Sequence, residues 1–316
     1  MALKLRGTKA VTLIGAPADL GAGIRGAALG PQSLRSAGLE QLLRESCLQV
    51  VAAEDVRGPG YPDELQASNC RCLSTICRWC EAVRESVGKG LARGYLPVLL
   101  GGDHSLSIGS IAAVAHHCAM VGKQLFVIWL DAHADFNTPQ TTPSGNVHGM
   151  PVAVICGDGP EELIQIGHRV PIASLSRITL VGVRSIDDAE AVRVKEKELR
   201  IYSMAEIHQR GMSRVMADAL APVLCGDSDF HLHVSFDVDF IDPAVAPGVG
   251  TRVPGGPGLA DADLCFSMIG ATGALGSMDV VEFNPAYDHN GHTAGVILSL
   301  LKTLFEADWR ARNGGA

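Results

Sequence analysis

Short apolar runs recur along the chain, and each is followed by a polar cluster and then by a helix-like stretch. Near-continuous apolar runs are typical of strands that are buried on both faces, as in a parallel sheet covered by helices. Helix-like segments such as Glu190–Glu198 and Ala260–Gly270 lie between the runs. The alternation predicts an α/β protein, a three-layer α/β/α sandwich with a mainly parallel central sheet. The predicted strands are Ala10–Ile14, Leu96–Leu100, Leu125–Leu130, Ile178–Val183, Leu232–Phe236 and Met278–Val281.

The chain shows no division into smaller units. No low-complexity tract, internal repeat or linker interrupts its 316 residues. Apolar residues make up 47% of the chain, which is enough to bury a sizeable core. We therefore expect residues 1–316 to form a single domain.

The polar clusters begin where the predicted strands end. Ligands of open α/β sheets bind in the crevice beyond the carboxyl ends of the strands, so these side chains are expected to meet at one edge. Burying several carboxylates without partners would be prohibitive, and bound cations would compensate for their charge. The strand ends carry two histidines and five carboxylates, namely His104, Asp131, His133, Asp135, Asp237, Asp239 and Glu282.

Six of these residues have the pattern of a site for two metal ions. The segments 131–135 and 237–239 carry their acidic and histidine residues at every second position, so each set projects from one side of an extended chain. His104 completes the set. Oxygen and nitrogen ligands without a thiolate suit Mn²⁺ better than a structural Zn²⁺. Six ligands exceed the needs of one ion with an open position, but carboxylates bridge ion pairs that generate hydroxide near neutral pH.

A helix cap or a surface-loop residue is the alternative interpretation of any one of these side chains. We expect Asp103 to be such a cap, because it directly precedes a helix-like segment. Three clusters at corresponding strand ends favour the metal site, since chance does not coordinate their placement.

Charge balance and cysteine content restrict the partners and the compartment. Lys and Arg number 26 against 34 Asp and Glu, a formal net charge of −8, so the chain has no overall attraction for nucleic acid or anionic lipid. No segment has the pattern of a signal peptide or a membrane span. Nine cysteines without framework spacing indicate reduced thiols. We expect a cytoplasmic protein that binds neither nucleic acid nor membranes.

Several motifs in order resemble the ureohydrolases, and the arginases in particular. They are DLGAGIRGAALGP (19–31), GGDHS (101–105), DAHAD (131–135), SGNVHG (144–149), SFDVDFIDP (235–243) and VEFNP (281–285). The likeness runs from about Val11 to Phe305 in the family's order and spacing. It implies one arginase-like catalytic domain over residues 1–316, with the arginase/deacetylase α/β/α fold. It also implies a homo-oligomer, either a trimer or a hexamer.

The resemblance further implies two Mn²⁺ ions per subunit, and all six ligand positions carry the family's residue. One ion would be held by His104, Asp131, Asp135 and Asp237. The second would be held by His133, Asp131, Asp237 and Asp239. Asp131 and Asp237 would bridge the ions, and Asp135 would also accept a hydrogen bond from the bridging hydroxide.

The activity that this family implies is hydrolysis of the guanidinium group of L-arginine to L-ornithine and urea. A guanidinium carbon is a poor electrophile, so a metal-bound hydroxide and charge stabilisation are both needed. We expect Glu282 to hold the guanidinium through a charge-assisted hydrogen bond. His148 is the expected proton shuttle to the departing amine, because an imidazole titrates near neutral pH. A salt-bridged strand end and a structural loop histidine are the respective alternatives.

Five further positions correspond to family residues that recognise the rest of the substrate. Asn137 and Ser144 would bind the α-carboxylate, Asp187 and Glu190 the α-amine, and Thr251 would lie near the guanidinium. Agmatine lacks the carboxylate, which favours arginine over agmatine as the substrate. Acidic residues are also favourable at a helix N-terminus, which is the competing explanation for Asp187 and Glu190. The alternative functions are an agmatinase or another guanidino-compound ureohydrolase, and a non-catalytic relative, although such a relative would normally have lost ligands.

Three features fall outside this pattern. Arg252, beside Thr251, is hypothesised to bias the site against cationic substrates or toward carboxylates. The histidines at 116–117, 289 and 292 are expected to be surface or supporting residues rather than ligands. Buried thiols, rather than a metal site or a redox switch, are the expected role of the cluster of Cys70, Cys72, Cys77 and Cys80.

Overall fold

Eight strands form one parallel sheet in the computed structural model, which describes residues 10–46, 48–52, 54–61, 69–225 and 229–314. The strand order is β2-β1-β3-β8-β7-β4-β5-β6, and every neighbouring pair runs parallel. The strands are β1 (Ala10–Ala16), β2 (Gln49–Ala52), β3 (Leu96–Gly101), β4 (Gln124–Leu130), β5 (Ile178–Val183), β6 (Arg200–Ser203), β7 (Phe230–Asp237) and β8 (Leu275–Val281).

The six predicted strands are confirmed, and the two edge strands, β2 and β6, were not predicted. The central strands β3 and β5 are buried at every position, as a strand covered on both faces must be. β6 contains exposed and half-buried residues only. Such a short edge strand has no apolar run by which the sequence could reveal it.

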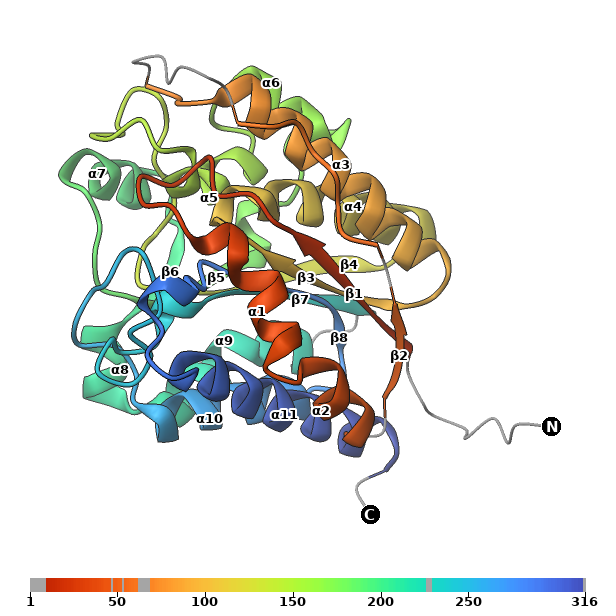
Figure 1. Cartoon of the computed structure of the whole chain (residues 1–316). Helices are drawn as coiled ribbons and strands as arrows, with labels where there is room; N and C mark the ends of the chain where they lie inside the picture. The colour runs from red at the N-terminus through yellow and green to blue at the C-terminus, as the bar shows by residue number, and fades with distance from the viewer. Residues whose placement is uncertain (1–9, 47, 53, 62–68, 226–228, 315–316) are drawn as a thin grey trace.

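Helices cover both faces of the sheet, which confirms the three-layer architecture (Figure 1). One face packs against α3 (Leu73–Ala92), α4 (Ser107–Val121), α5 (Pro151–Ile155) and α6 (Glu161–Ile164). The other packs against α1 (Gly30–Ser36), α2 (Leu39–Glu45), α8 (Met204–Arg210), α9 (Met212–Cys225), α10 (Leu259–Ala271) and α11 (His292–Arg312). α7 (Asp188–Glu196) follows β5, and α7 and α10 confirm the two helix-like segments of the sequence.

A close approach of α3 and α4 fixes the first turn after β3. A Cβ atom at Gly109 of α4 would overlap the backbone carbonyl of Cys80 in α3, so this spacing requires glycine. The 3₁₀ turn His104–Leu106 leads directly into α4. The packing of the two helices therefore determines where His104 lies.

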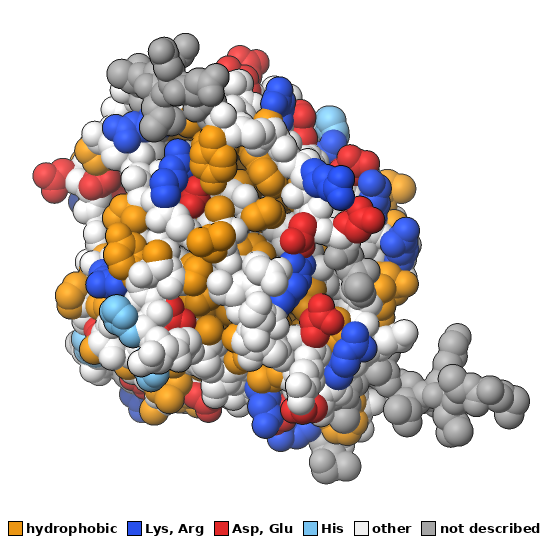
Figure 2. Space-filling model, in the orientation of Figure 1, with side chains coloured by type: hydrophobic (Ala, Val, Ile, Leu, Met, Phe, Trp, Pro, Cys, Tyr) orange, Lys and Arg blue, Asp and Glu red, His pale blue; other side chains and the backbone are white. Residues whose placement is uncertain are grey.

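The surface carries both signs of charge. On the face drawn in Figure 2, basic and acidic side chains are interspersed around a hydrophobic area. This face therefore has no broad region of a single charge. Among the described residues, no helix combines the length and the apolar character that crossing a membrane requires.

Candidate metal centre

Four neighbouring strands, β3, β8, β7 and β4, deliver the predicted ligands to the carboxyl edge of the sheet. His104 opens the turn after β3, and the segment 131–135 follows β4. Asp237 ends β7, and Asp239 lies in the 3₁₀ turn that comes next. Glu282 directly follows β8. Because these strands are adjacent in space, residues far apart in the sequence converge as predicted.

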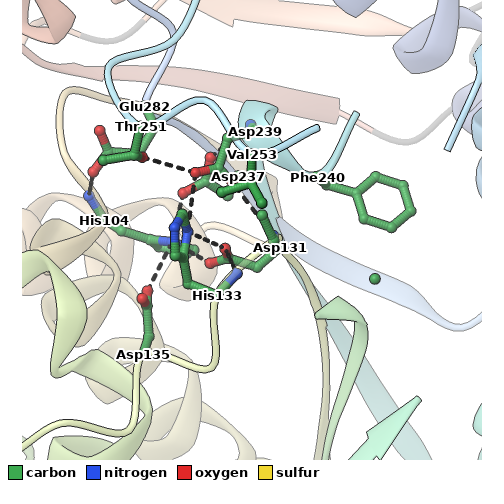
Figure 3. A network of polar contacts seen from close by, with 12 residues as sticks. His104, Asp131, His133, Asp135, Asp237, Asp239, Phe240, Thr251, Val253 and Glu282 are labelled. Atoms are coloured by element: carbon green, nitrogen blue, oxygen red, sulfur yellow. Dashed lines mark hydrogen bonds and ion pairs between the residues drawn. The ribbon is translucent and has the colours of Figure 1, made fainter. Parts of the chain in front are cut away.

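The first group of ligands surrounds the imidazole of His104. Its Nδ1 atom lies 3.1 Å from a carboxylate oxygen of Asp131, 3.2 Å from one of Asp135 and 3.1 Å from one of Asp237. Figure 3 shows the three carboxylates pointing toward this ring. One atom of each of His104, Asp131 and Asp135 lies within 4.8 Å of the others, a spacing that suits a cation between them.

The second group shares Asp131 with the first. His133 Nδ1 lies 3.3 Å from Asp131 Oδ1 and 3.1 Å from Asp239 Oδ2, and the ligand atoms of these three residues also lie within 4.8 Å of one another. Asp131 therefore presents Oδ1 to the second group and Oδ2 to the first (Figure 3). One oxygen toward each group is the arrangement that a ligand bridging two ions requires.

The buried charge of this cluster suits cations. Burial and the neighbouring charge of Asp131 raise the pKa of Asp135 to about 7. Burial, together with Asp239 and Asp131, also raises the pKa of Asp237 well above its ordinary value. Asp135 Oδ2 is buried, and its contact in the described part of the chain is with His104 Nδ1 at 3.2 Å. Oxygen and imidazole ligands of this kind fit divalent cations of the Mn²⁺ class.

Two buried side chains that the sequence interpretation missed orient the ligands. The indole N–H of Trp129 donates to Asp131 Oδ2 at 2.9 Å, and the indole stacks on the His104 ring with 4.0 Å between the ring centroids. Ser235 Oγ lies 2.8 Å from His104 Nε2, which leaves Nδ1 for the carboxylates. Trp129 and Ser235 each stand two residues before an aspartate ligand on the same side of a strand. This two-residue spacing is the feature of the sequence from which their supporting role could have been predicted.

Glu282 and His148 form a pair next to the first group. Glu282 Oε1 lies 2.9 Å from His148 Nδ1 and accepts the backbone N–H of His104, also at 2.9 Å. Burial lowers the pKa of His148, but Glu282 and two aspartates outweigh it and raise this pKa to about 9. The imidazole therefore carries a proton at neutral pH.

Asp103 is a cap, as predicted, and it also contacts the glycine-rich stretch near the N-terminus. Its carboxylate accepts the N–H of Ser105 at 2.9 Å and the N–H of Gly21 at 2.7 Å. The carbonyl of Gly21 in turn accepts the backbone N–H of His148 at 3.2 Å. The cap is thus connected to the loop that carries His148.

A cavity of about 240 Å³ opens at the cluster, lined by ligands of both groups and by His148. Glu282 is 3% exposed and does not line the cavity. The five other residues predicted to recognise the substrate do line it, namely Asn137, Ser144, Asp187, Glu190 and Thr251. The hydroxyl of Thr251 donates to Asp239 Oδ2 at 2.9 Å, which links the cavity lining at Thr251 to the second ligand group.

Asp187 and Glu190 are helix-end residues as well as cavity residues. They form the capping box of α7, in which Glu190 Oε2 accepts the Asp187 N–H at 3.1 Å. Glu190 Oε1 accepts the backbone N–H of Phe136 at 2.7 Å, and Asn137 donates to Asp187 at 2.9 Å. The helix-end explanation is therefore confirmed. The same hydrogen bonds hold three of the predicted recognition residues in one wall of the cavity.

The cysteine cluster lies apart from the metal groups. Cys72 precedes α3 with a backbone φ of 56°, so Cys70 and Cys72 are outside the helix. No cysteine of the described residues joins a candidate metal group. Cys72, Cys77 and Cys80 are free thiols, whereas Cys47 lies outside the described residues. Burial raises the pKa of Cys77 to about 12, in keeping with an unreactive thiol.

Arg252 and the remaining histidines also lie outside the cavity lining. The Arg252 guanidinium lies 4.9 Å from the Tyr287 ring centroid, and its Nε donates to the Pro247 carbonyl at 2.8 Å. This geometry argues against the hypothesis that Arg252 selects the substrate. In the described part of the chain, no candidate metal group includes His116, His117, His289 or His292.

A parallel sheet with paired histidine–carboxylate groups at its carboxyl edge places the chain among the metal-dependent hydrolases. The family model described as "Arginase family" matches residues 9–306. The arginase of Bacillus caldovelox is 38% identical over 300 residues, covering 94% of this chain and 98% of that protein. The chain belongs to the arginase family.

Solved structures of the family have the same fold. The native structure of the Bacillus caldovelox arginase superposes with a TM-score of 0.88 at 38% identity, covering 94% of this chain and 98% of that one. The Entamoeba histolytica arginase in complex with L-ornithine gives a TM-score of 0.85 at 32% identity, covering 94% and 99%. The family resemblance of the sequence motifs is therefore confirmed over almost the whole chain.

Proposed function

We propose that the chain hydrolyses L-arginine to L-ornithine and urea. The observation that carries the proposal is the cavity, where the two ligand groups meet the four residues predicted to recognise the amino-acid end of arginine and Thr251, predicted to lie near the guanidinium. Family membership supports it, as does the similarity to an arginase whose structure contains L-ornithine.

The proposed cofactor is a pair of Mn²⁺ ions per subunit. One would be held by His104, Asp131, Asp135 and Asp237, and the other by His133, Asp131, Asp237 and Asp239. The oxygen and nitrogen donors and the two-sided placement of Asp131 support this assignment. When bound, the ions lower the pKa of a water molecule and supply hydroxide as the nucleophile.

Three residues are proposed to act on the reacting group. Asp135, whose carboxylate lines the cavity beside His104, orients the attacking water. Glu282 binds the guanidinium through a charge-assisted hydrogen bond. His148, which is protonated at neutral pH and hydrogen-bonded to Glu282, donates a proton to the departing amine.

Recognition of the amino-acid end is proposed to use residues of the cavity that are not metal ligands. Asn137 and Ser144 donate hydrogen bonds to the α-carboxylate, and Asp187 and Glu190 attract the α-ammonium group. Thr251 lies near the guanidinium, where its hydroxyl also contacts Asp239. A substrate without the carboxylate would lose its hydrogen bonds to Asn137 and Ser144, which is the basis for disfavouring agmatine.

The test is urea release by the purified full-length chain after incubation with Mn²⁺, with L-arginine and agmatine compared side by side. We expect a strong preference for L-arginine that disappears with a chelator. Preference for agmatine would retain the metal site and Glu282 but overturn the roles of Asn137, Ser144, Asp187 and Glu190. No urea from either compound, with two ions bound, would overturn the proposed substrate.

We also propose that residues 1–316 act as one catalytic domain in a cytoplasmic homo-oligomer, a trimer or a hexamer. Family membership supports the assembly, and the free thiols support a reducing compartment. Light scattering coupled to size-exclusion chromatography tests the assembly, and a monomeric mass would contradict it.

A further inference from the structure

Arg184 has an unusual set of contacts beside the second ligand group. It directly follows β5 and is half-buried. Its Nη2 donates to the carbonyl of Asp239 at 2.7 Å, and its Nη1 donates to that of Phe240 at 3.0 Å. Nη2 and Nε both donate to the carbonyl of Val253, at 2.8 and 3.0 Å. A single guanidinium thus binds the turn that carries Asp239 and the loop that carries Thr251.

The side chain of Arg184 donates to backbone carbonyl groups rather than to carboxylates. Nη1 also donates to the carbonyl of Gly182 at 3.2 Å and Nη2 to that of Ile241 at 3.4 Å, so the described hydrogen bonds of the side chain go to carbonyl groups. A Cβ atom at Gly256 would lie 2.6 Å from Nη2, so the absence of a side chain at position 256 leaves space for the guanidinium. The geometry is that of a clamp between two loops.

The backbone of Arg184 supports the other side of the same group. Its N–H donates to the carbonyl of Ala132 at 2.8 Å, and the N–H of Ser185 donates to the same oxygen at 3.0 Å. Ser185 also forms a parallel bridge with His133. The N–H of Ala132 in turn donates to Asp239 Oδ1 at 3.1 Å. The guanidinium of Arg184 therefore holds the turn of Asp239, whereas the segment of His133 is supported by the backbone of residues 184 and 185.

The ligands of the first group, around His104, are held in place by other residues. His104 is held by Ser235 and by stacking on Trp129. The carbonyl of Asp135 accepts the backbone N–H of Val152 at 2.9 Å, on the side of the sheet covered by α5. In the described part of the chain, neither His104 nor Asp135 makes a hydrogen bond to Arg184.

We propose that Arg184 is a positioning residue for the second of the two cation sites: its guanidinium holds the turn that carries Asp239, a ligand of that site alone, and makes no hydrogen bond with the shared ligands Asp131 and Asp237. The inference rests on the two-ion part of the proposed function and not on the identity of the substrate. Residues that orient metal ligands typically change metal affinity about 10- to 100-fold when replaced. The effect of losing Arg184 is expected in that range and at one site only.

The experiment is calorimetric titration of Mn²⁺ into the metal-stripped, full-length protein. Wild type is expected to bind two ions per chain. Arg184→Met is expected to keep one ion at wild-type affinity and to bind the other about 10- to 100-fold more weakly. Arg184→Lys keeps the cation without the forked donors, and it gives a smaller loss at the same site if Arg184→Met does not fold. Arg210→Met, which removes an arginine paired with Glu206 and Asp218, is the matched control and keeps both ions.

Second substitutions identify the weakened site. Adding His133→Asn to Arg184→Met should leave the remaining ion in place, whereas adding His104→Asn should remove it. Two ions at wild-type affinity in Arg184→Met and Arg184→Lys would overturn the inference. An equal loss of both ions, with a lower melting temperature of the metal-free protein, would show a general structural role instead.

Urea release separates this inference from the proposed substrate. Wild type that binds two ions without releasing urea from L-arginine would overturn the substrate and leave the role of Arg184 intact. Wild type that binds fewer than two ions would overturn the two-ion proposal and the role of Arg184 with it.

Discussion

Two acidic residues of the site, Asp135 and Glu282, have left-handed backbone conformations, with φ angles of 49° and 63°. A residue with a Cβ atom adopts this conformation at a cost of roughly 1–2 kcal/mol. Such strain persists where the surrounding structure determines the position of a side chain. At Glu282 the strained turn directs the carboxylate to the N–H of His104 and to His148.

Replacing Glu282 separates this strain from the function of the side chain. Both Glu282→Ala and Glu282→Gly are expected to abolish urea release. The glycine variant should have the higher free energy of unfolding, by about 1 kcal/mol, because only it relieves the left-handed backbone. Chemical denaturation measures the difference. At Glu85, an exposed position of α3, the order should be the reverse, with alanine more stable by about 1 kcal/mol. If Glu282→Ala were as stable as Glu282→Gly, the inferred backbone strain at position 282 would be contradicted.

Asp135 gives the metal-free protein a defined pH dependence. Burial and Asp131 raise its pKa from 3.8 to about 7, so the folded state binds more protons than the unfolded state between these values. The contribution of Asp135 to stability is therefore present at low pH and lost as the pH rises from about 4 to 7. In chelator, Asp135→Asn should gain at least about 1 kcal/mol over wild type across this window. Urea denaturation of both proteins at several pH values measures this gain. A difference in stability that does not change with pH would be inconsistent with the raised pKa of Asp135.

The ligands were predictable from the sequence because each lies directly at the end of an apolar run. Trp129, Ser235 and Arg184 were not predicted, since the contacts that give them their roles, with His104 for the first two and with two loops for Arg184, join distant segments. The donors of Arg184, for example, bind carbonyls more than 50 residues away, at Asp239 and Val253. Such roles depend on packing that no local pattern encodes.

At the scale of the helices, the contact between α3 and α4 is the tightest constraint near the site. Gly109→Ala would place a methyl group against the backbone of Cys80, which cannot move without shifting α3. We expect a loss of about 1–3 kcal/mol in the free energy of unfolding. Gly88→Ala, in the interior of α3 with no atom within 4 Å of the new Cβ, is the matched control and should gain about 0.5–1 kcal/mol. Equal effects of the two substitutions on chemical denaturation would contradict the close packing.

The strands differ in how well the sequence predicts them. β3, β4 and β5 have apolar side chains on both faces and were found from this alone. β2 and β6 have a neighbour on one side only, and each pairs over four residues. Edge strands need fewer apolar residues, so β6 has the composition of a loop.

For the whole molecule, the metal ions are expected to stabilise the fold as well as the reaction. They would hold residues from β3, β4 and β7 together at the carboxyl edge of the sheet. At a free Mn²⁺ concentration 100 times the dissociation constant, binding adds about 2.7 kcal/mol to the free energy of unfolding. A chelator should therefore lower the melting temperature by roughly 5 °C. Circular dichroism measures the shift. The variant carrying both His104→Asn and His133→Asn should show a smaller one, and an equal shift would contradict stabilisation through this site.

The three-layer architecture was predictable because strand and helix patterns alternate along the whole chain. The strand order was not, because the sequence does not indicate which strands are neighbours. β8, late in the chain, pairs with β3 on one side and with β7 on the other.

This position of β8 has a consequence for synthesis on the ribosome. Until residues 275–281 emerge, β3 and β7 each lack a neighbour at the centre of the sheet. The nascent chain then consists of two partial sheets with apolar strand edges, which are the surfaces that aggregate most readily. Glu282, the residue after β8, is among the last parts of the site to be made. Addition of β8 therefore covers the facing edges of β3 and β7 and brings Glu282 to the site in the same step.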